Sequence, residues 1–600
     1  MIATVTDSTK TDLSAAPAKE SAHISFRRQL AATARAIAFS PVGKTLLALV
    51  TTTVLVVVGT AYGQIRLNRW NKPFYDALSR RDFHEFLYQL GVFCMIAGSL
   101  LVLNVAQRWL VETLELKLRE GLVRSLLKDW LLPRRAFWLA NSGAMGVNPD
   151  QRIHEDARKL CELSADLGVG LLQASILFGT FSGVLWNLSA GLTVRVNGSD
   201  YALPGFMVWA AIIYAFGGSL VSYWVGRGLI GSSAERSARE ADLRFSLVRV
   251  NEHVDDISLA HGETHERRRI ELNLKSVLRA TRRIVRGHTN LTWVTSGFGW
   301  ITVVAPVLVS APLYFTGKVT FGGLMMAAGA FTQAQSSLRW FIDNFSAIAD
   351  WRATLLRIAN FRHALATTHE PKGFAGRISY SEGDSDSMRI DGLEIVSSAN
   401  ADRLKEPNVL LAPAERALIV CAPGTGKTQL FRALAGLWPW GTGHIVRPKQ
   451  IFYLPRGSPY FPRGTLREVL AYPLKADSFA ATDVTRALYR LGLERLAPML
   501  NETRRWDREL NHDEQLSLAF ARVLLQKPPW VLMDGTLGSL DNDVQEAVID
   551  VFTNELQHTG ILHIGGPGDA RPLFSTVLHL VKLPNDPSSA ASEIEPVTRQ

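Results

Sequence analysis

Six long apolar runs in the first 350 residues constrain this chain more than any other feature. Each run has 20 or more residues without Asp, Glu, Lys or Arg, and a helix needs about 20 residues to cross a bilayer. Because a backbone in hydrocarbon must satisfy its polar groups internally, the runs predict six transmembrane α-helices. The runs are Thr45–Ile65, Phe86–Gln107, Leu167–Val194, Tyr201–Gly226, Gly287–Gly317 and Val319–Leu338.

The chain after about residue 385 has a different pattern. Short apolar strands alternate there with amphipathic helices, which is typical of an α/β domain outside the membrane. The sequence therefore predicts five parts, and Ile24–Phe39 within the first is an optional interfacial helix. The parts are a cytoplasmic leader (1–40), a six-helix transmembrane domain (41–366), a linker (367–387), an α/β domain (388–583) and a disordered tail (584–600).

The net charge of +10 follows the membrane topology. Arg108–Glu162 and Arg227–Gly287 hold ten and thirteen Lys and Arg residues, whereas Ala190–Pro204 and Ala311–Thr320 hold one each. The positive-inside rule then places the two basic segments and both termini in the cytoplasm. The basic segments also have a helical pattern, so we expect them to prolong the second and fourth spans. Charge organised in this way does not indicate a nucleic-acid partner.

The segment from Cys421 to Thr428 has most of the residues of a phosphate-binding loop. A strand-like run precedes it and a helix-like run follows, so backbone amides and a helix N-terminus would cradle phosphates. The predicted nucleotide contacts are Cys421, Pro423, Gly424, Thr425, Gly426, Lys427, Thr428 and Gln429. Cys421 stands where the pattern has its first glycine, and we expect this to weaken binding if the backbone there needs unusual torsions.

Further motifs follow the loop in a characteristic order. They are Tyr453–Arg456, Leu510–Gln515, Val531–Asp534 and Ser539–Asp541. With the loop, they resemble the ATPase domain of ABC transporters, a P-loop NTPase fold. The resemblance implies ATP and Mg²⁺ as cofactors, Thr428 and Asp534 as magnesium ligands, and Asp534 as the remaining Walker B acid. It also implies that Arg456 occupies the position of the Q-loop glutamine beside the nucleotide.

Several motif positions depart from this family pattern. Gly535 stands where the catalytic glutamate would be, and Gly566 where the switch histidine would be; His563, three residues earlier, is a possible substitute. Asn511 and Asp513 replace the serine and second glycine of the signature. Phosphoryl transfer depends on positioning a water and stabilising charge, so these losses should slow hydrolysis by orders of magnitude. We expect the domain to bind ATP and hardly hydrolyse it, unless the loop is a relic.

The membrane half carries a more specific resemblance. The segments Asn148–Asp156, Leu203–Trp209, Gly262–Glu266 and Ala311–Gly317 are similar to those of the SbmA/BacA peptide-uptake permeases. The similarity extends to their ATPase-bearing bacterial relatives, close to the peroxisomal subfamily of ABC transporters. It implies an exporter-type half-transporter in the bacterial inner membrane that pairs with a second copy or a related half-transporter. The implied cargo is a peptide-like, bulky hydrophilic or small-molecule compound.

The energy source stays open at this level. ATP could drive transport through unconventional catalytic residues, a proton gradient could drive it with a regulatory or vestigial nucleotide domain, or the chain could be the degenerate half of a heterodimer. A membrane-bound nucleotide sensor is a fourth possibility. Few ionisable groups are associated with the spans: Asp166 at the start of the third, His288 at the start of the fifth and Asp343 beyond the charge-free part of the sixth. They are either solvated caps of the helix ends or candidates for proton coupling.

Overall fold

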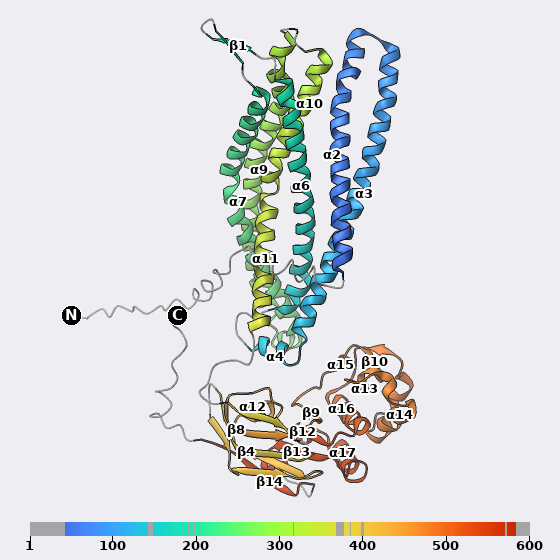
Figure 1. Cartoon of the computed structure of the whole chain (residues 1–600). Helices are drawn as coiled ribbons and strands as arrows, with labels where there is room; N and C mark the ends of the chain where they lie inside the picture. The colour runs from blue at the N-terminus through green and yellow to red at the C-terminus, as the bar shows by residue number, and fades with distance from the viewer. Residues whose placement is uncertain are drawn as a thin grey trace, which may run out of the picture. The chain divides into compact units, whose positions relative to one another are not determined.

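The computed structural model describes residues 42–583, except 142–147, 190–192, 197–198, 203, 316, 318, 368–376, 384–385, 398–400 and 570–572. The chain divides into two compact units between Thr368 and His369. The interfacial helix predicted over Ile24–Phe39 and the predicted tail 584–600 lie outside the described residues. Figure 1 shows the helical unit and the α/β unit of the chain.

Six long helices in the described residues form the bundle of the membrane unit. They are α2 (Gly43–Arg80), α3 (Phe83–Trp130), α6 (Ala157–Leu188), α7 (Phe206–Glu252), α9 (Glu263–Phe315) and α10 (Phe321–Asp343). Shorter elements are α4 (Arg135–Ala140), α5 (Pro149–Gln151), the π-helix η3 (Arg152–Asp156), β1 (Thr193–Val196), β2 (Ser199–Ala202), α8 (Val254–Leu259) and α11 (Phe345–Thr367). Helix α2 packs against α3, and α7 packs against α9, with α6 and α10 between these pairs (Figure 1).

The longest helices extend beyond the bilayer, as the sequence predicts. Helices α3, α7 and α9 have 48, 47 and 53 residues, so each is about 70 to 80 Å long. The hydrocarbon core is only about 30 Å thick. The first parts of the two basic segments, 108–130 and 227–252, are therefore helical continuations of the second and fourth spans.

Helix α10 corresponds to the sixth predicted span but differs in composition from the others. Five helical segments of the described chain are long and apolar enough to cross a membrane, namely Gly43–Arg80, Phe83–Trp130, Pro149–Leu188, Phe206–Glu252 and Glu263–Pro312. Helix α10 is not among them, because Gly, Ala, Gln and Ser lower its hydropathy. It packs against α2, α6, α7 and α9. Small residues suit such helix–helix contacts, so neighbouring helices rather than lipid explain its sequence.

The N-terminus of α10 is held by a buried acid of α2. The Asp76 carboxylate accepts hydrogen bonds from the Gly322 amide at 2.8 Å and from the Thr320 hydroxyl at 3.0 Å. A Cβ atom at Gly322 would lie 2.0 Å from the carbonyl oxygen of Lys72. Only glycine permits this approach, and Asp76 compensates the free amides of the helix end.

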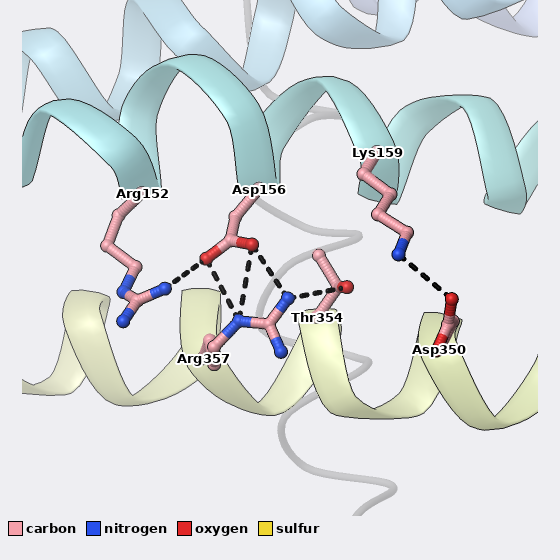
Figure 2. Close-up of polar contacts among 6 residues, drawn as sticks. All are labelled: Arg152, Asp156, Lys159, Asp350, Thr354 and Arg357. Atoms are coloured by element: carbon pink, nitrogen blue, oxygen red, sulfur yellow. Dashed lines mark hydrogen bonds and ion pairs between the residues drawn. The ribbon is translucent and has the colours of Figure 1, made fainter. Parts of the chain in front are cut away.

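A second buried acid joins α11 to the segment that begins α6 (Figure 2). Asp156 ends the π-helix η3 and is 4% exposed. Its carboxylate oxygens accept bonds from Arg357 at 2.7 and 3.0 Å and from Arg152 at 2.5 Å. Arg357 also donates to the Thr354 hydroxyl at 3.0 Å. An exposed pair, Lys159 and Asp350, joins the same helices at 2.9 Å.

The α/β unit contains a ten-stranded sheet. Its strands are β3 (Ser379–Glu382), β4 (Met388–Val396), β5 (Ala401–Leu404), β6 (Asn408–Leu411), β7 (Arg416–Cys421), β8 (Gly441–Arg447), β9 (Ile451–Leu454), β12 (Trp530–Asp534), β13 (Gly560–Gly565) and β14 (Thr576–Lys582). The order is β3-β8-β4-β5-β14-β7-β13-β12-β9, and β6 pairs with β4. Strands β14, β7, β13, β12 and β9 are parallel. Their middle strands β7, β13 and β12 are mostly apolar and buried, because both faces are covered.

The helices of this unit pack in two apolar cores: the first helix with the sheet strands, in a core that contains Leu430 and Ile419, and the others in a second core that contains Trp506 and Phe520. They are α12 (Lys427–Leu434), α13 (Leu466–Ala471), α14 (Ala481–Arg490), α15 (Trp506–Glu509), α16 (His512–Gln526) and α17 (Asn542–Asn554). Minor elements are β10 (Gly464–Thr465), η4 (Ala476–Ser478), η5 (Glu494–Met499), β11 (Thr503–Arg504), η6 (Leu537–Ser539) and η7 (Pro567–Asp569). Strand β3 lies inside the segment predicted as a linker, 367–387. Its residues Ser379–Glu382 pair in parallel with β8, so the sheet begins before residue 388.

We predict that the two acids of Figure 2 differ in their effect on stability. Asp156→Asn removes the charge that accepts hydrogen bonds from two arginines, so it should destabilise the membrane unit by about 2 kcal/mol. The matched change Asp350→Asn breaks an exposed pair and should cost at most about 0.5 kcal/mol. Denaturant unfolding of the purified full chain measures both. Equal effects of the two substitutions would contradict a structural role for Asp156.

Candidate functional site

The carboxyl ends of the central parallel strands bring the predicted site residues to one edge of the sheet. Strand β7 ends at Cys421 and leads into the loop before α12, and β12 ends at Asp534. Strand β13 leads to Gly566, and β9 leads to Arg456. Ligands of open α/β sheets bind outside such strand ends. The topology therefore assembles a candidate site from four separate stretches of sequence.

Cys421 does not strain the loop, which corrects the expectation from the sequence. It is the last residue of β7, its backbone is not left-handed, and its side chain is 3% exposed. Its Sγ atom lies 3.7 Å from the carbonyl oxygen of Ile419. Burial raises the pKa of the thiol to about 11, although the charge of Lys427 opposes this. The thiol is a neutral core group beneath the loop.

The rest of the loop has the chemistry that phosphate binding needs. Gly424 has φ +79°, which favours glycine, and no atom lies within 4 Å of the place where its Cβ would be. Pro423 and Thr428 are exposed, and Lys427 opens α12. The Thr425 hydroxyl donates to the carbonyl oxygen of Ala422 at 2.7 Å, which fixes the turn. Gln429 lies in the first turn of α12. These residues fit a nucleotide phosphate.

Asp534 lies at the buried floor of the same edge. It is 3% exposed, and burial raises the pKa of its carboxyl. The positive charges of Arg456 and Lys427 oppose that rise. A carboxylate near a lysine and a threonine hydroxyl is a suitable donor set for Mg²⁺, which binds hard oxygen ligands. The chain thus retains groups that would hold Mg-nucleotide.

Gly535 and Gly566 supply no side chain to this edge. Gly535 has φ +64°, and its amide donates to the carbonyl oxygen of Ile564 at 2.8 Å. The space around its missing Cβ is open to 4 Å. The amide of Gly566 donates to the Asp569 carboxylate at 2.7 Å. Position 535 therefore offers no carboxylate to orient water. The Gly566 amide already donates its hydrogen bond to Asp569.

His563 is fully buried in β13. Its ring stacks on Phe574 with centroids 5.7 Å apart, and its Nε2 atom lies 3.7 Å from Asp569 Oδ2. This contact with His563 and the hydrogen bond from Gly566 lower the pKa of Asp569. The structure thus places His563 inside the sheet, in contact with Asp569 and Phe574.

The signature segment begins α16 with a complete capping box. The Asn511 side chain accepts from the Glu514 amide at 2.8 Å, and the Glu514 carboxylate accepts from the Asn511 amide at 3.1 Å. Asp513 lies in the same first turn. Acids there interact favourably with the positive end of the helix dipole. This helix N-terminus is therefore already compensated by the chain itself.

Two acids near the predicted site were not identified from the sequence. Asp402 on β5 is 1% exposed, and its Oδ2 atom accepts from the Gly426 amide at 2.9 Å. Asp569 follows the sheet and bonds the Gly566 amide. Arg403 and Lys405 follow Asp402 in the sequence, so no local pattern marked this acid as buried. No local pattern distinguishes Asp569 from an ordinary loop acid.

Comparisons with known proteins assign both units. A family model described as "ABC transporter transmembrane region 2" matches residues 35–315, and one described as "ABC transporter" matches residues 404–537. A solved structure of a bacterial Atm1-family ABC exporter with ATP bound has a TM-score of 0.68 and covers 90% of this chain and 94% of its own. Its identity is 16%, so this likeness shows the fold. The predicted fold class is confirmed.

Relatives match along most of the chain. The inner membrane ABC transporter ATP-binding protein YddA of Escherichia coli (strain K12) is 27% identical over 529 residues, which cover 87% of this chain and 91% of that protein. ABC transporter D family member 2, chloroplastic, of Arabidopsis thaliana is 27% identical over 591 residues, which cover 86% and 80%. This chain is therefore a half-size ABC transporter, with a transmembrane region fused to an ABC ATPase domain, and is related to the D family.

Proposed function

We propose that this chain is a subunit of an inner-membrane transporter whose nucleotide domain binds Mg-ATP and hardly hydrolyses it. One observation carries the proposal: Lys427 and Thr428 share a sheet edge with the buried Asp534, while the next residue, Gly535, has no side chain. Groups for holding a nucleotide are present, and the group that would orient water is missing. The inner membrane is proposed from the name of the E. coli relative and the distribution of basic residues.

The roles of the site residues follow from their chemistry. Lys427 and the loop amides would bind phosphate, and Arg456 would add positive charge beside Asp534. Thr428 and Asp534 would hold Mg²⁺, which when bound would neutralise phosphate charge. Gly535 and Gly566 offer no polar side chain toward the nucleotide. Binding can therefore persist while the positioning of the attacking water is lost.

We propose a polar, peptide-like or bulky hydrophilic cargo. A cavity of about 350 Å³ between α3 and α6 supports this, because amide side chains and one charge of each sign line it. The polar lining is formed by Asn104, Gln107, Arg108, Asp166 and Gln173. Gln107 Nε2 donates to Gln173 Oε1 at 3.0 Å, and Gln107 Oε1 is buried without a partner in the described chain. Such groups suit a cargo with amide and charged groups.

The active unit is proposed to be a dimer, because the family builds each ATP site from two domains. A homodimer would contain two sites that lack the glutamate. A heterodimer with an intact half-transporter would contain one competent glutamate, and co-purification of such a partner would favour it. A proton-driven permease is the other candidate. Asp343 pairs with Arg339 and His288 is exposed, so buried Asp76 is a better candidate proton carrier than either.

We predict binding without appreciable turnover. The purified full chain should bind Mg-ATP in a calorimetric titration, and Lys427→Ala should abolish the signal because it removes the phosphate-binding charge. ATP turnover should be far below the roughly 1 s⁻¹ that marks the lower end of ordinary enzymes. Turnover at or above that rate by the homodimer would overturn the proposal.

A glycine pair tests the geometry at the missing glutamate. Gly535→Ala should destabilise the nucleotide domain by about 1 kcal/mol, because a left-handed residue with a Cβ is strained. Gly566→Ala is the matched control, since its Cβ would only make an ordinary contact with Asp569 Oδ2 at 3.9 Å and its φ is not left-handed. Thermal unfolding of both variants measures the difference in stability, and equal stability would contradict strain at position 535. Gly535→Glu together with Gly566→His should restore turnover only in part, because Asn511 and Asp513 still depart from the signature of the family.

Transport measurements separate the energy sources. Uptake of a labelled peptide into vesicles that survives Lys427→Ala but stops with a protonophore would establish gradient-driven transport. We then expect Asp76→Asn to abolish it, whereas Asp343→Asn, at an exposed ion pair, should not. Uptake that stops in Lys427→Ala and continues with the protonophore would establish ATP-dependent transport. No uptake under any condition would favour the sensor class.

A further inference from the structure

The phosphate-binding loop satisfies two of its own amides in this structure. The Gly426 amide donates to Asp402 Oδ2 at 2.9 Å, and the Lys427 amide donates to the carbonyl oxygen of Thr425 at 3.0 Å. Gly426 has φ −78° and ψ 67°, the torsions of an inverse γ-turn. Phosphate-binding loops instead direct successive amides at the ligand. The loop is thus closed on acceptors of the chain.

Asp402 reaches the loop from outside the recognised motifs. Strand β5 pairs with β14, where Asp402 lies opposite Lys582, and β14 pairs with β7, which leads into the loop. The Asp402 side chain is 1% exposed, and its Oδ1 atom has no hydrogen-bond partner in the described chain. A buried carboxylate with one unsatisfied oxygen is costly. Its position therefore depends on the Gly426 amide.

The electrostatic surroundings show that this acid and Lys427 act on the same place. Both charges influence the Cys421 thiol at the base of the loop, with opposite signs. A carboxylate that accepts a hydrogen bond from a loop amide takes the place that a phosphate oxygen has in a nucleotide-bound loop. A nucleotide triphosphate carries about four negative charges, so it and the carboxylate repel each other at low dielectric. Both cannot occupy Gly426.

We propose that Asp402 is an internal competitor for the phosphate site: its carboxylate holds the Gly426 amide until a nucleoside di- or triphosphate displaces it. This deepens the proposed nucleotide binding and rests on it. The ligand class is set by the phosphates, because Asp402 competes for a phosphate contact and not for the base or ribose. The competitor keeps the affinity of the loop below the value that its amides and Lys427 would otherwise give.

The test compares the full chain, purified in lipid nanodiscs, with two Asp402 variants. Asp402→Asn keeps the shape and removes the charge. Asp402→Val suits a buried strand and removes the unsatisfied oxygen, so it should fold even if the first variant does not. Mg-ATP, Mg-ADP and adenosine are titrated by calorimetry. Asp391→Asn is the matched control, because this acid lies on neighbouring β4 and pairs with Arg389 at 2.8 Å.

Both Asp402 variants should bind Mg-ATP and Mg-ADP about ten-fold more tightly than the wild type, since one charged hydrogen bond no longer competes. Adenosine binding and the Asp391→Asn control should not change. Unchanged or weaker Mg-ATP binding in a folded Asp402 variant would overturn the proposal. Unfolding of both variants would also overturn it, because Asp402 would then be a required support of the loop.

The Lys427→Ala variant distinguishes failure of the proposed function from failure of this inference. If Lys427→Ala binds Mg-ATP as well as the wild type does, the loop is not the nucleotide site, and the inference falls with that proposal. If Lys427→Ala abolishes binding while both folded Asp402 variants bind like the wild type, nucleotide binding stands and only the competition is wrong.

Discussion

Hydrocarbon offers the peptide backbone no hydrogen-bonding partner, and the membrane unit depends on this constraint. Long helices satisfy it along their length, but each helix end leaves free amides. Acidic side chains accept hydrogen bonds from some of these amides. Asp82 accepts from the Glu85 amide at the start of α3, and Asp76 accepts from the Gly322 amide at the start of α10. Asp76 also joins two helices that are far apart in sequence. The position of α10 among its neighbours therefore depends on a polar contact as well as on packing.

The same requirement takes a different form in the α/β unit. The amides at the ends of its strands and helices could donate to a ligand, but several of them donate to carboxylates of the chain instead. Asp402 bonds Gly426, Asp569 bonds Gly566, and Glu514 bonds Asn511. An anion that binds at these amides meets negative charge of the chain. Three segments that are separate in the sequence therefore share one feature: a carboxylate of the chain accepts a hydrogen bond from an amide that an anion would need.

The sequence predicts the features that depend on periodicity and local spacing. The six long helices, the loop between β7 and α12, and the strand end at Asp534 are of this kind, since each rests on neighbouring residues. Strand β3 could not be recognised, because its polar residues gain their place only by pairing with β8. The low hydropathy of α10 likewise reflects four neighbouring helices. Asp402 and Asp156 acquire their roles through partners 24 and 201 residues away, which no local pattern encodes.

The contact between Asp156 and Arg357 has a mechanical consequence. Helix α11 is the last helix of the membrane unit, and the second unit begins two residues after its end at Thr367. The arginine fastens α11 to η3 about ten residues before that end. The helix beyond the arginine is also held, because Ile358, Phe361, Ala364 and Leu365 are buried in one core cluster with Leu122 on α3 and Leu160 on α6. A force applied at the connection is therefore passed to α3 and α6 through the packed end of α11, and the ion pair and this packing together act as its anchor.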